Sequence, residues 1–251
     1  MKYKENKFYS DGITLNYITK GKGKPILFLH GGGLKALTYK KNLELLSKKY
    51  KVIAPDIPGF GNSSTPTKLW DFEDYANFFS KFIDSLNLKN IMIIGHSFGG
   101  GIAMNLATKN KRVSKLILID SAGIAPKHSL NKIIYLLHIE MAHNIFSAKN
   151  EEISLTISSD FITRFFKNSL TVSHMFKITN NALFKKYTCF NKITQPTFIF
   201  WGYNDEVFTR DIAKKFNKRI KNSQLEYING EHVWCLMMPE KLFELILKTD
   251  E

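Results

Sequence analysis

The short segment Gly95-His96-Ser97-Phe98-Gly99 limits the possible fold more than any other part of this sequence. It follows the apolar run NIMII, which is typical of a buried strand, and it leads into GGGIAMNLAT, which is typical of a helix. A G-x-S-x-G turn between a strand and a helix is tight, and its serine side chain stands above the carboxyl end of the strand. If Ser97 is a nucleophile, a base, an acid and oxyanion-binding groups must lie at the same edge of the sheet.

Six apolar runs are typical of strands buried on both faces, because apolar and polar residues do not alternate in them. They are PILFLH at 25–30, YKVIAPD at 50–56, NIMIIGHS at 90–97, VSKLILID at 113–120, PTFIFWG at 196–202 and SQLEYI at 223–228. Residues 6–19 are typical of two short strands joined by a turn. Helical spacing follows at 72–86, and Thr209 and Pro239 suit the starts of two later helices. This alternation predicts an α/β fold with a mostly parallel sheet.

Residues 123–188 break the alternation, because no run in them is typical of a buried strand. Three apolar stripes at helical spacing fill the segment instead. They are Leu130, Ile133, Ile134, Leu137, Met141 and Ile145; Phe161, Ile162, Phe165, Phe166 and Leu170; and Val172, Met175, Phe176, Thr179 and Leu183. We therefore predict a core formed by residues 1–122 and 189–251, with a helical cap at 123–188.

The chain is strongly basic, with a formal net charge of +14, which raises the question of nucleic-acid binding. Lysines outnumber arginines 32 to 4, however, and they are scattered through every segment. Arginine is the residue suited to bidentate contacts with phosphates and bases. The pattern therefore favours a solvated basic surface, and we expect no nucleic-acid partner.

Cysteine usage and hydropathy predict a cytoplasmic protein. The two cysteines, Cys189 and Cys235, form no disulfide framework, which agrees with a reducing compartment. Runs such as ILFL and LILI are far too short to span a membrane, and the N-terminal residues hold no apolar stretch of signal-peptide length. The sequence shows neither a zinc-ligand spacing nor a phosphate-loop motif, so we expect no metal and no cofactor.

His232 is the best candidate for the base, because it follows the last apolar run and precedes the last helix. Asp205 follows the run at 196–202 and is the best candidate for the acid. Both then lie at the same sheet edge as Ser97, in the chain order Ser, Asp, His. Asp120, at the end of another run, and the adjacent Glu206 remain rival acids.

Backbone N–H groups must stabilise the negative charge that develops on the substrate oxygen. We expect one from Phe98, directly after the nucleophile, and one from the HGGG loop, with Gly32 preferred over Gly33. We further expect the substrate to contact Gly33, Phe161, Phe165 and Trp234.

The segments FLHGGG, DIPGFGNSS, GHSFGG, WGYNDEVF and GEHVWCLMMPE resemble, in this order, the signature segments of the α/β-hydrolase superfamily. The resemblance spans the chain from about Phe8 to Leu247. It implies an eight-stranded, mostly parallel sheet with helices on both faces and a helical cap between strands six and seven. It also implies a Ser97–His232–Asp205 triad that works without a cofactor. Glu231 and Met237 depart from the family pattern beside the histidine.

These observations predict a serine hydrolase that cleaves a carboxylic ester or thioester of a small to medium acyl group. A carbon–carbon bond hydrolase and an aminopeptidase of the same fold are alternatives, and a non-catalytic ligand receptor is an alternative from another class. A serine at the elbow argues against epoxide opening and dehalogenation, which need a carboxylate there. The basic excess in 123–188 suggests a substrate on an anionic carrier, although lysines are common throughout this chain.

Overall fold

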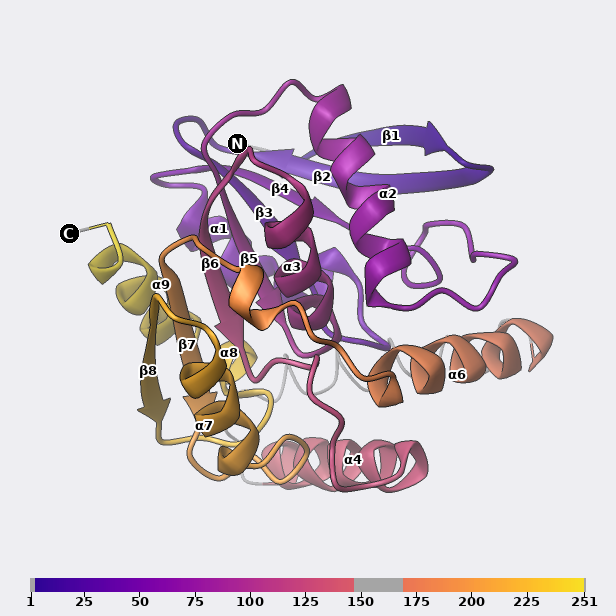
Figure 1. The fold of residues 1–251 in the computed structure, drawn as a ribbon, viewed down its shortest axis with the longest axis vertical. Helices are drawn as coiled ribbons and strands as arrows, with labels where there is room; N and C mark the ends of the chain where they lie inside the picture. Colours follow the sequence, from indigo (N-terminus) through magenta and orange to yellow (C-terminus); the bar gives the residue numbers. More distant parts are fainter. Residues whose placement is uncertain (1–2, 147–168, 251) are drawn as a thin grey trace.

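The chain folds around one eight-stranded sheet, which the computed structural model describes within residues 3–146 and 169–250 (Figure 1). The strand order is β1-β2-β4-β3-β5-β6-β7-β8; β1 and β2 pair antiparallel, β2 pairs antiparallel with β4, and β3 to β8 run parallel. The strands are β1 (Lys4–Ser10), β2 (Ile13–Lys20), β3 (Pro25–Leu29), β4 (Lys51–Pro55), β5 (Ile91–His96), β6 (Val113–Ile119), β7 (Thr197–Gly202) and β8 (Ser223–Ile228). The predicted α/β fold with an eight-stranded, mostly parallel sheet is confirmed.

Helices cover both faces of the sheet. One face packs against α2 (Phe72–Ser85), α3 (Phe98–Lys109) and α7 (Arg210–Arg219), and the other against α1 (Lys40–Leu46), α8 (Trp234–Met237) and α9 (Pro239–Lys248). Short 3₁₀ turns lie at Ala36–Tyr39 and Phe190–Lys192. None of the helices within 3–146 and 169–250 is long and apolar enough to cross a membrane. The cytoplasmic location remains a prediction.

Strand geometry explains how two cores arise from one run of apolar residues. Successive side chains of a strand point to opposite faces. In β3, Leu27 therefore joins the core under α2 and α3, while Ile26 and Phe28 join the core under α1 and α9. Both faces of the strand are therefore buried, as its continuous apolar run indicates.

The last apolar run does not behave in this way. We predicted SQLEYI to be buried on both faces, but β8 is an edge strand with Gln224 and Glu226 exposed and only Ile228 buried. Ser223, Leu225 and Tyr227 are half-buried. Burial on both faces was wrong here, because β8 is the edge strand of the described sheet and pairs only with β7 among the described strands.

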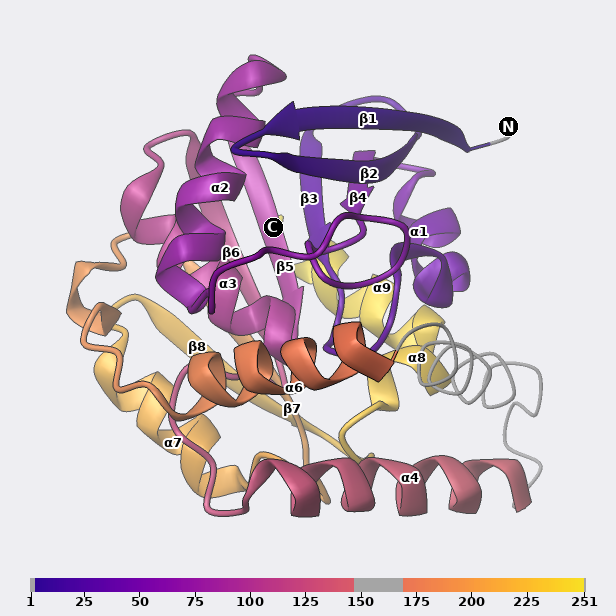
Figure 2. The ribbon, with the colours of Figure 1, turned by 90° about the vertical axis from the view of Figure 1, so that its right-hand side faces the viewer.

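Within the described residues, the helices α4 (Leu130–Phe146) and α6 (Ser169–Phe184) lie between β6 and β7 in the chain. Figures 1 and 2 show both of them across the end of the molecule toward which the parallel strands point. The predicted helical insertion between strands six and seven is thus present, while the division at residues 122, 123, 188 and 189 remains a prediction.

The apolar stripes predict the buried faces of these helices only in part. In α4, Leu130, Ile133 and Met141 are buried as expected. In α6, Met175 is buried, but Phe176 is exposed over 38% of its surface. The residues that replace it in the core are Ile178 and Ala182. The stripe at 161–170 lies outside the described residues except for its end.

Candidate active site

Ser97 lies at the turn between β5 and α3, with φ at 51°. This positive φ is uncommon for a residue with a side chain and is typical of a strained functional turn. A Cβ on Gly99 would overlap the carbonyl oxygens of Leu29 and His30, so that position requires glycine. The Ser97 N–H donates to the Ile119 carbonyl at 2.9 Å, which ties the turn to β6.

Ser97, His232 and Asp205 form one chain of hydrogen bonds. The distance from Ser97 Oγ to His232 Nε2 is 2.9 Å, and the distance from His232 Nδ1 to Asp205 Oδ2 is 2.8 Å. His232 and Asp205 are buried, whereas Ser97 is partly exposed. The structure therefore brings together three residues that the sequence places on three separate segments.

The partners of Asp205 determine which imidazole nitrogen carries the proton. Asp205 Oδ1 accepts N–H groups from Val207 at 2.7 Å and Phe208 at 2.9 Å. These bonds hold the carboxylate so that Oδ2 accepts from His232 Nδ1–H. His232 Nε2 then carries a lone pair, which accepts the Ser97 hydroxyl proton. This is the tautomer that general-base catalysis by His232 requires.

The pKa of His232 reflects two opposed effects. Burial lowers the pKa of His232, while the charge and hydrogen bond of Asp205 and the charge of Glu140 raise it. The net result is a pKa above the ordinary value.

A pH profile tests this direction. We expect kcat/KM for a neutral ester to increase as His232 loses its proton, with a midpoint above the ordinary imidazole pKa of about 6.5. Initial rates between pH 5 and about 9 measure it, with protein stability checked at each pH. A midpoint below the ordinary value would contradict the electrostatic role of Asp205 and Glu140.

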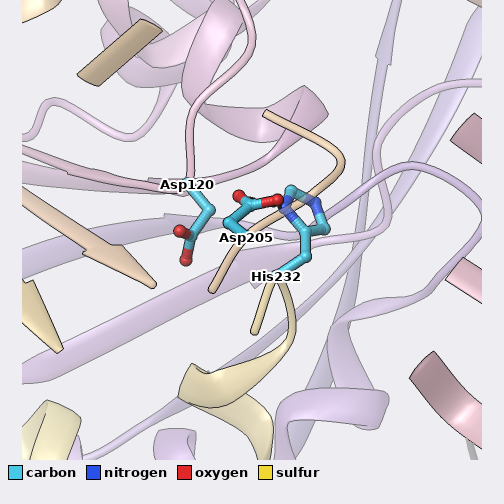
Figure 3. A group of neighbouring side chains, drawn as sticks. All are labelled: Asp120, Asp205 and His232. Carbon is cyan, nitrogen blue, oxygen red and sulfur yellow. Dashed lines mark hydrogen bonds and ion pairs between the residues drawn. The ribbon is translucent and has the colours of Figure 1, made fainter. Parts of the chain in front are cut away.

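Asp120, the first rival acid, follows β6 and lies beside Asp205, as Figure 3 shows. Its Oδ1 accepts the Gly202 N–H at 2.7 Å, and the structure gives Oδ2 no hydrogen bond to any described residue. Burial and then the charge of Asp205 raise the pKa of Asp120 well above its ordinary value. Glu206, the second rival, is exposed. The hydrogen bond to His232 therefore comes from Asp205.

Asp120, Asp205 and His232 also offer possible metal ligands, since one atom from each lies within 4.8 Å of the others. Both oxygens of Asp205 and both nitrogens of His232 already take part in the hydrogen bonds described above. The same groups thus form a complete hydrogen-bonded triad, and we assign no metal to them.

His96, directly before Ser97, connects three parts of the site. Its Nε2–H donates to the His232 carbonyl at 3.0 Å, and its Nδ1 accepts from the Tyr39 hydroxyl at 2.6 Å. The Tyr39 oxygen in turn accepts the Gly31 N–H at 3.1 Å. Burial and then the charge of His232 lower the pKa of His96 to about 3, so its ring stays neutral.

His30 supports the glycine loop through both of its ring nitrogens. The Ile57 N–H donates to His30 Nε2 at 2.9 Å, so the proton is on Nδ1, which donates to the Gly31 carbonyl at 2.8 Å. The histidine thus joins the loop after β3 to the loop after β4.

The predicted oxyanion groups lie next to one another. Phe98 begins α3, where helix N–H groups lack intrahelical partners. A Cβ on Gly32 would lie 3.4 Å from the Phe98 Cβ, so the two segments are in contact. Gly33 follows with φ at 78°. Their roles in binding an oxyanion remain predictions.

Three of the predicted substrate contacts are Phe161, Phe165 and Trp234. Phe161 and Phe165 lie outside the described residues. Trp234 is only 2% exposed and packs in the core with α9 residues such as Leu242. Sequence reasoning also missed Glu140 on α4, whose carboxylate accepts the Val233 N–H directly after His232.

Comparison with known proteins agrees with this architecture. Residues 24–138 match the model of a family described as "alpha/beta hydrolase fold". The chain is 26% identical to the AB hydrolase superfamily protein YisY of Bacillus subtilis, over 93% of this chain and 94% of the relative. It is also 26% identical to a 2-hydroxy-6-oxo-6-(2'-aminophenyl)hexa-2,4-dienoic acid hydrolase of Metapseudomonas resinovorans, over 88% of this chain and 81% of the relative.

Among solved structures, an enol-lactonase from Burkholderia xenovorans superposes with a TM-score of 0.83. The alignment covers 97% of this chain and 98% of the lactonase, at 15% identity, so the likeness is one of fold. Because the family match over residues 24–138, the relatives aligned along nearly their whole length and the sheet topology all agree, we conclude that this chain has the α/β-hydrolase fold.

Proposed function

We propose that this protein is a serine hydrolase that cleaves a carboxylic ester or thioester through an acyl-enzyme intermediate. One observation carries the proposal: the hydrogen bonds from Ser97 to His232 and from His232 to Asp205, at 2.9 and 2.8 Å. A serine hydroxyl is a weak nucleophile alone, and a neutral imidazole within hydrogen-bond distance is what activates it.

In the proposed reaction, Ser97 Oγ attacks the ester carbonyl carbon while its proton moves to His232 Nε2. The carbonyl oxygen becomes an oxyanion, which the N–H groups of Phe98 and Gly32 stabilise. As the bond to the leaving alcohol or thiol breaks, the imidazolium returns its proton to the leaving group. Water then attacks the acyl-serine by the same steps, releasing the acid and restoring Ser97.

A carbon–carbon bond hydrolase is the second candidate, and the dienoic acid hydrolase among the relatives favours it. The same triad supports both reactions. An aminopeptidase would need carboxylates in the cap for the substrate ammonium group. In the described part of the cap, Glu140 already accepts a backbone hydrogen bond. A non-catalytic receptor would not need the Ser97–His232–Asp205 arrangement at all.

A substrate panel separates these functions. We propose to assay acyl esters and thioesters of graded length, a dienoate diketone and aminoacyl amides, with fluorophosphonate labelling run in parallel. Turnover of short esters with labelled Ser97 supports the proposal. Turnover of the dienoate diketone alone supports the carbon–carbon reaction, and labelling at no serine contradicts both.

We further propose that the cap sets the acyl length. In α6, the Met175 side chain packs onto Gly59, whose neighbour Phe60 contacts the Phe98 ring at a centroid distance of 5.4 Å. Met175→Ala should shift kcat/KM toward longer esters by about tenfold relative to short ones, because an apolar pocket discriminates by the methylenes that it accommodates. The exposed neighbour Phe176 is the matched control, and Phe176→Ala should leave the preference unchanged. Equal losses by Met175→Ala on every ester would indicate a folding role instead.

The proposal also includes a test for an anionic carrier on the substrate. In the described part of the cap, Lys127 pairs with Asp211 at 3.1 Å, and Lys185 pairs with Asp71. Lys132 lies over the Tyr135 ring. These contacts favour a surface role for the lysines. Measuring kcat/KM against ionic strength for matched neutral and anionic esters distinguishes a surface role of these lysines from attraction of an anionic substrate. Salt screens the attraction of the anionic ester and leaves the neutral ester unaffected.

A further inference from the structure

Glu140 lies on the cap helix α4, but its side chain reaches the loop that carries His232. The residue is 8% exposed, and its Oε1 accepts the Val233 N–H at 2.7 Å. Val233 directly follows His232. The cap is therefore hydrogen-bonded to the backbone beside the proposed base, and Figure 1 shows α4 at that end of the sheet.

The peptide unit between His232 and Val233 is held from two sides. Its carbonyl accepts from His96 Nε2 at 3.0 Å, and its N–H donates to Glu140. The carbonyl and N–H of a trans peptide point in opposite directions, and the unit is planar. His96 belongs to the core strand β5 and Glu140 to the cap helix α4. Together they fix the plane of the peptide unit directly after the His232 side chain.

A carboxylate is an expensive choice for this position if a hydrogen bond is all that is required. Burial of an ionised group is unfavourable, whereas a neutral amide oxygen would accept the same N–H at less cost. Burial raises the pKa of Glu140 to about 7; His232 and the Val233 N–H oppose this increase, while Asp205 and Glu231 add to it. The charge of Glu140 in turn raises the pKa of His232.

The other groups near this contact are few in the described part of the chain. His143, one turn further along α4, lies 3.6 Å from Glu231, and both side chains of this pair are exposed. The Asn144 side chain donates to the Glu140 backbone carbonyl at 2.9 Å. An exposed pair such as His143–Glu231 contributes little, so Glu140 is the main polar link between α4 and the His232 loop.

We infer that Glu140 is a positioning residue for the hydrolysis proposed above: it fixes the His232 loop through Val233 and places negative charge beside the imidazolium that forms during the reaction. The inference rests on the proposed function. It also means that the cap takes part in the geometry of the triad. A shift of α4 would break the hydrogen bond to the Val233 N–H and, at the same time, move the Glu140 charge away from His232.

Two substitutions separate the hydrogen bond from the charge. Glu140→Gln keeps an acceptor oxygen but removes the charge, and Glu140→Leu removes both at similar size. We expect Glu140→Leu to lower kcat and the rate of fluorophosphonate labelling by roughly tenfold to a hundredfold, with KM changed less than about threefold. Glu140→Gln should keep most of the labelling rate at a pH where His232 is neutral. His143→Gln, on the same helix, is the matched control and should change neither rate.

The titration of His232, followed by NMR with labelled histidine, measures the charge directly and needs no substrate. We expect a lower His232 pKa in Glu140→Gln than in the native protein, because a negative charge beside the imidazolium is gone. A merely structural role would leave this titration unmoved. If Glu140→Leu fails to fold, the His232 titration in Glu140→Gln still shows whether the Glu140 charge acts on His232.

Two results would overturn the inference: an unchanged His232 titration in Glu140→Gln, or a folded Glu140→Leu protein that is labelled at the native rate. Failure of the proposed function looks different. A protein that is labelled at Ser97 but hydrolyses no ester has another substrate class, and the labelling comparison still tests Glu140. A native protein that is not labelled refutes the nucleophile, while the titration still reports on the Glu140 charge.

Discussion

Ser97→Ala is expected to lower kcat roughly 10⁵- to 10⁶-fold on whichever ester the native protein cleaves best, because no acyl-enzyme can form without the Oγ atom. The fold should survive. Among the residues that the structure describes, Ser97 Oγ has one hydrogen bond, the bond to His232, and alanine tolerates the φ of 51° as well as serine does. Circular dichroism and the thermal midpoint check the fold, and steady-state kinetics measure the loss.

Mass spectrometry after fluorophosphonate treatment should place the adduct on Ser97 in the native protein and find none in Ser97→Ala. Ser121 supplies the control, since it is a buried serine just beyond the carboxyl end of β6, with its hydroxyl bonded to the Ala122 carbonyl at 2.8 Å. Ser121→Ala should be labelled as the native protein is. An active native sample with unmodified Ser97 would remove the residue from the mechanism.

Much of the fold could be predicted because parallel strands carry a strong signal. The strands β3 to β7 are each buried on both faces, so their sequences are continuous apolar runs. Their carboxyl ends share one edge of the sheet, which is where side chains that follow the strands meet. This is why Ser97 and His232, 135 positions apart, could be paired from the sequence.

Other elements gave no such signal. The short helix α1 was not predicted, since its sequence KKNLELL is mostly polar and buries only Asn42, Leu43 and Leu46. The exposure of β8 was missed because an apolar run shows that a strand can be buried, but its neighbours decide whether it is. In α6, the choice between Phe176 and Ile178 for the buried face depended on how the helix is rotated against the core.

The groups that support the triad were the hardest to predict. Glu140 meets Val233 across 93 positions, and Tyr39 meets His96 across 57. Each contact depends on how a helix outside the sheet docks onto it. A charged residue within an apolar stripe was the available signal for Glu140, since burial of such a residue demands a partner. The sequence did not name that partner.

Asp205→Asn is expected to lower kcat/KM roughly 10⁴-fold, because the imidazole would adopt the wrong tautomer. The amide oxygen would remain where Oδ1 accepts the Val207 and Phe208 N–H groups. The amide NH₂ would then face His232 Nδ1 and force it to accept. The proton would move to Nε2, which could donate to Ser97 Oγ but could not take its proton. The pH profile and kcat/KM on one ester measure the effect.

Asp120→Asn is the matched control, and its expected result is nearly the opposite. Burial and the charge of Asp205 raise the pKa of Asp120 well above its ordinary value, which favours the neutral form of this side chain over the charged one. Asparagine has nearly the same shape and keeps an oxygen for the Gly202 N–H at the Oδ1 position. We expect kcat/KM to stay within about threefold of the native value. If Asp205→Asn kept the native kcat/KM while Asp120→Asn lost most of it, the acid of the triad would be Asp120, after β6, and not Asp205, after β7. A crippling loss in both variants would mean that His232 needs both carboxyl groups, which then act on the imidazole as a pair.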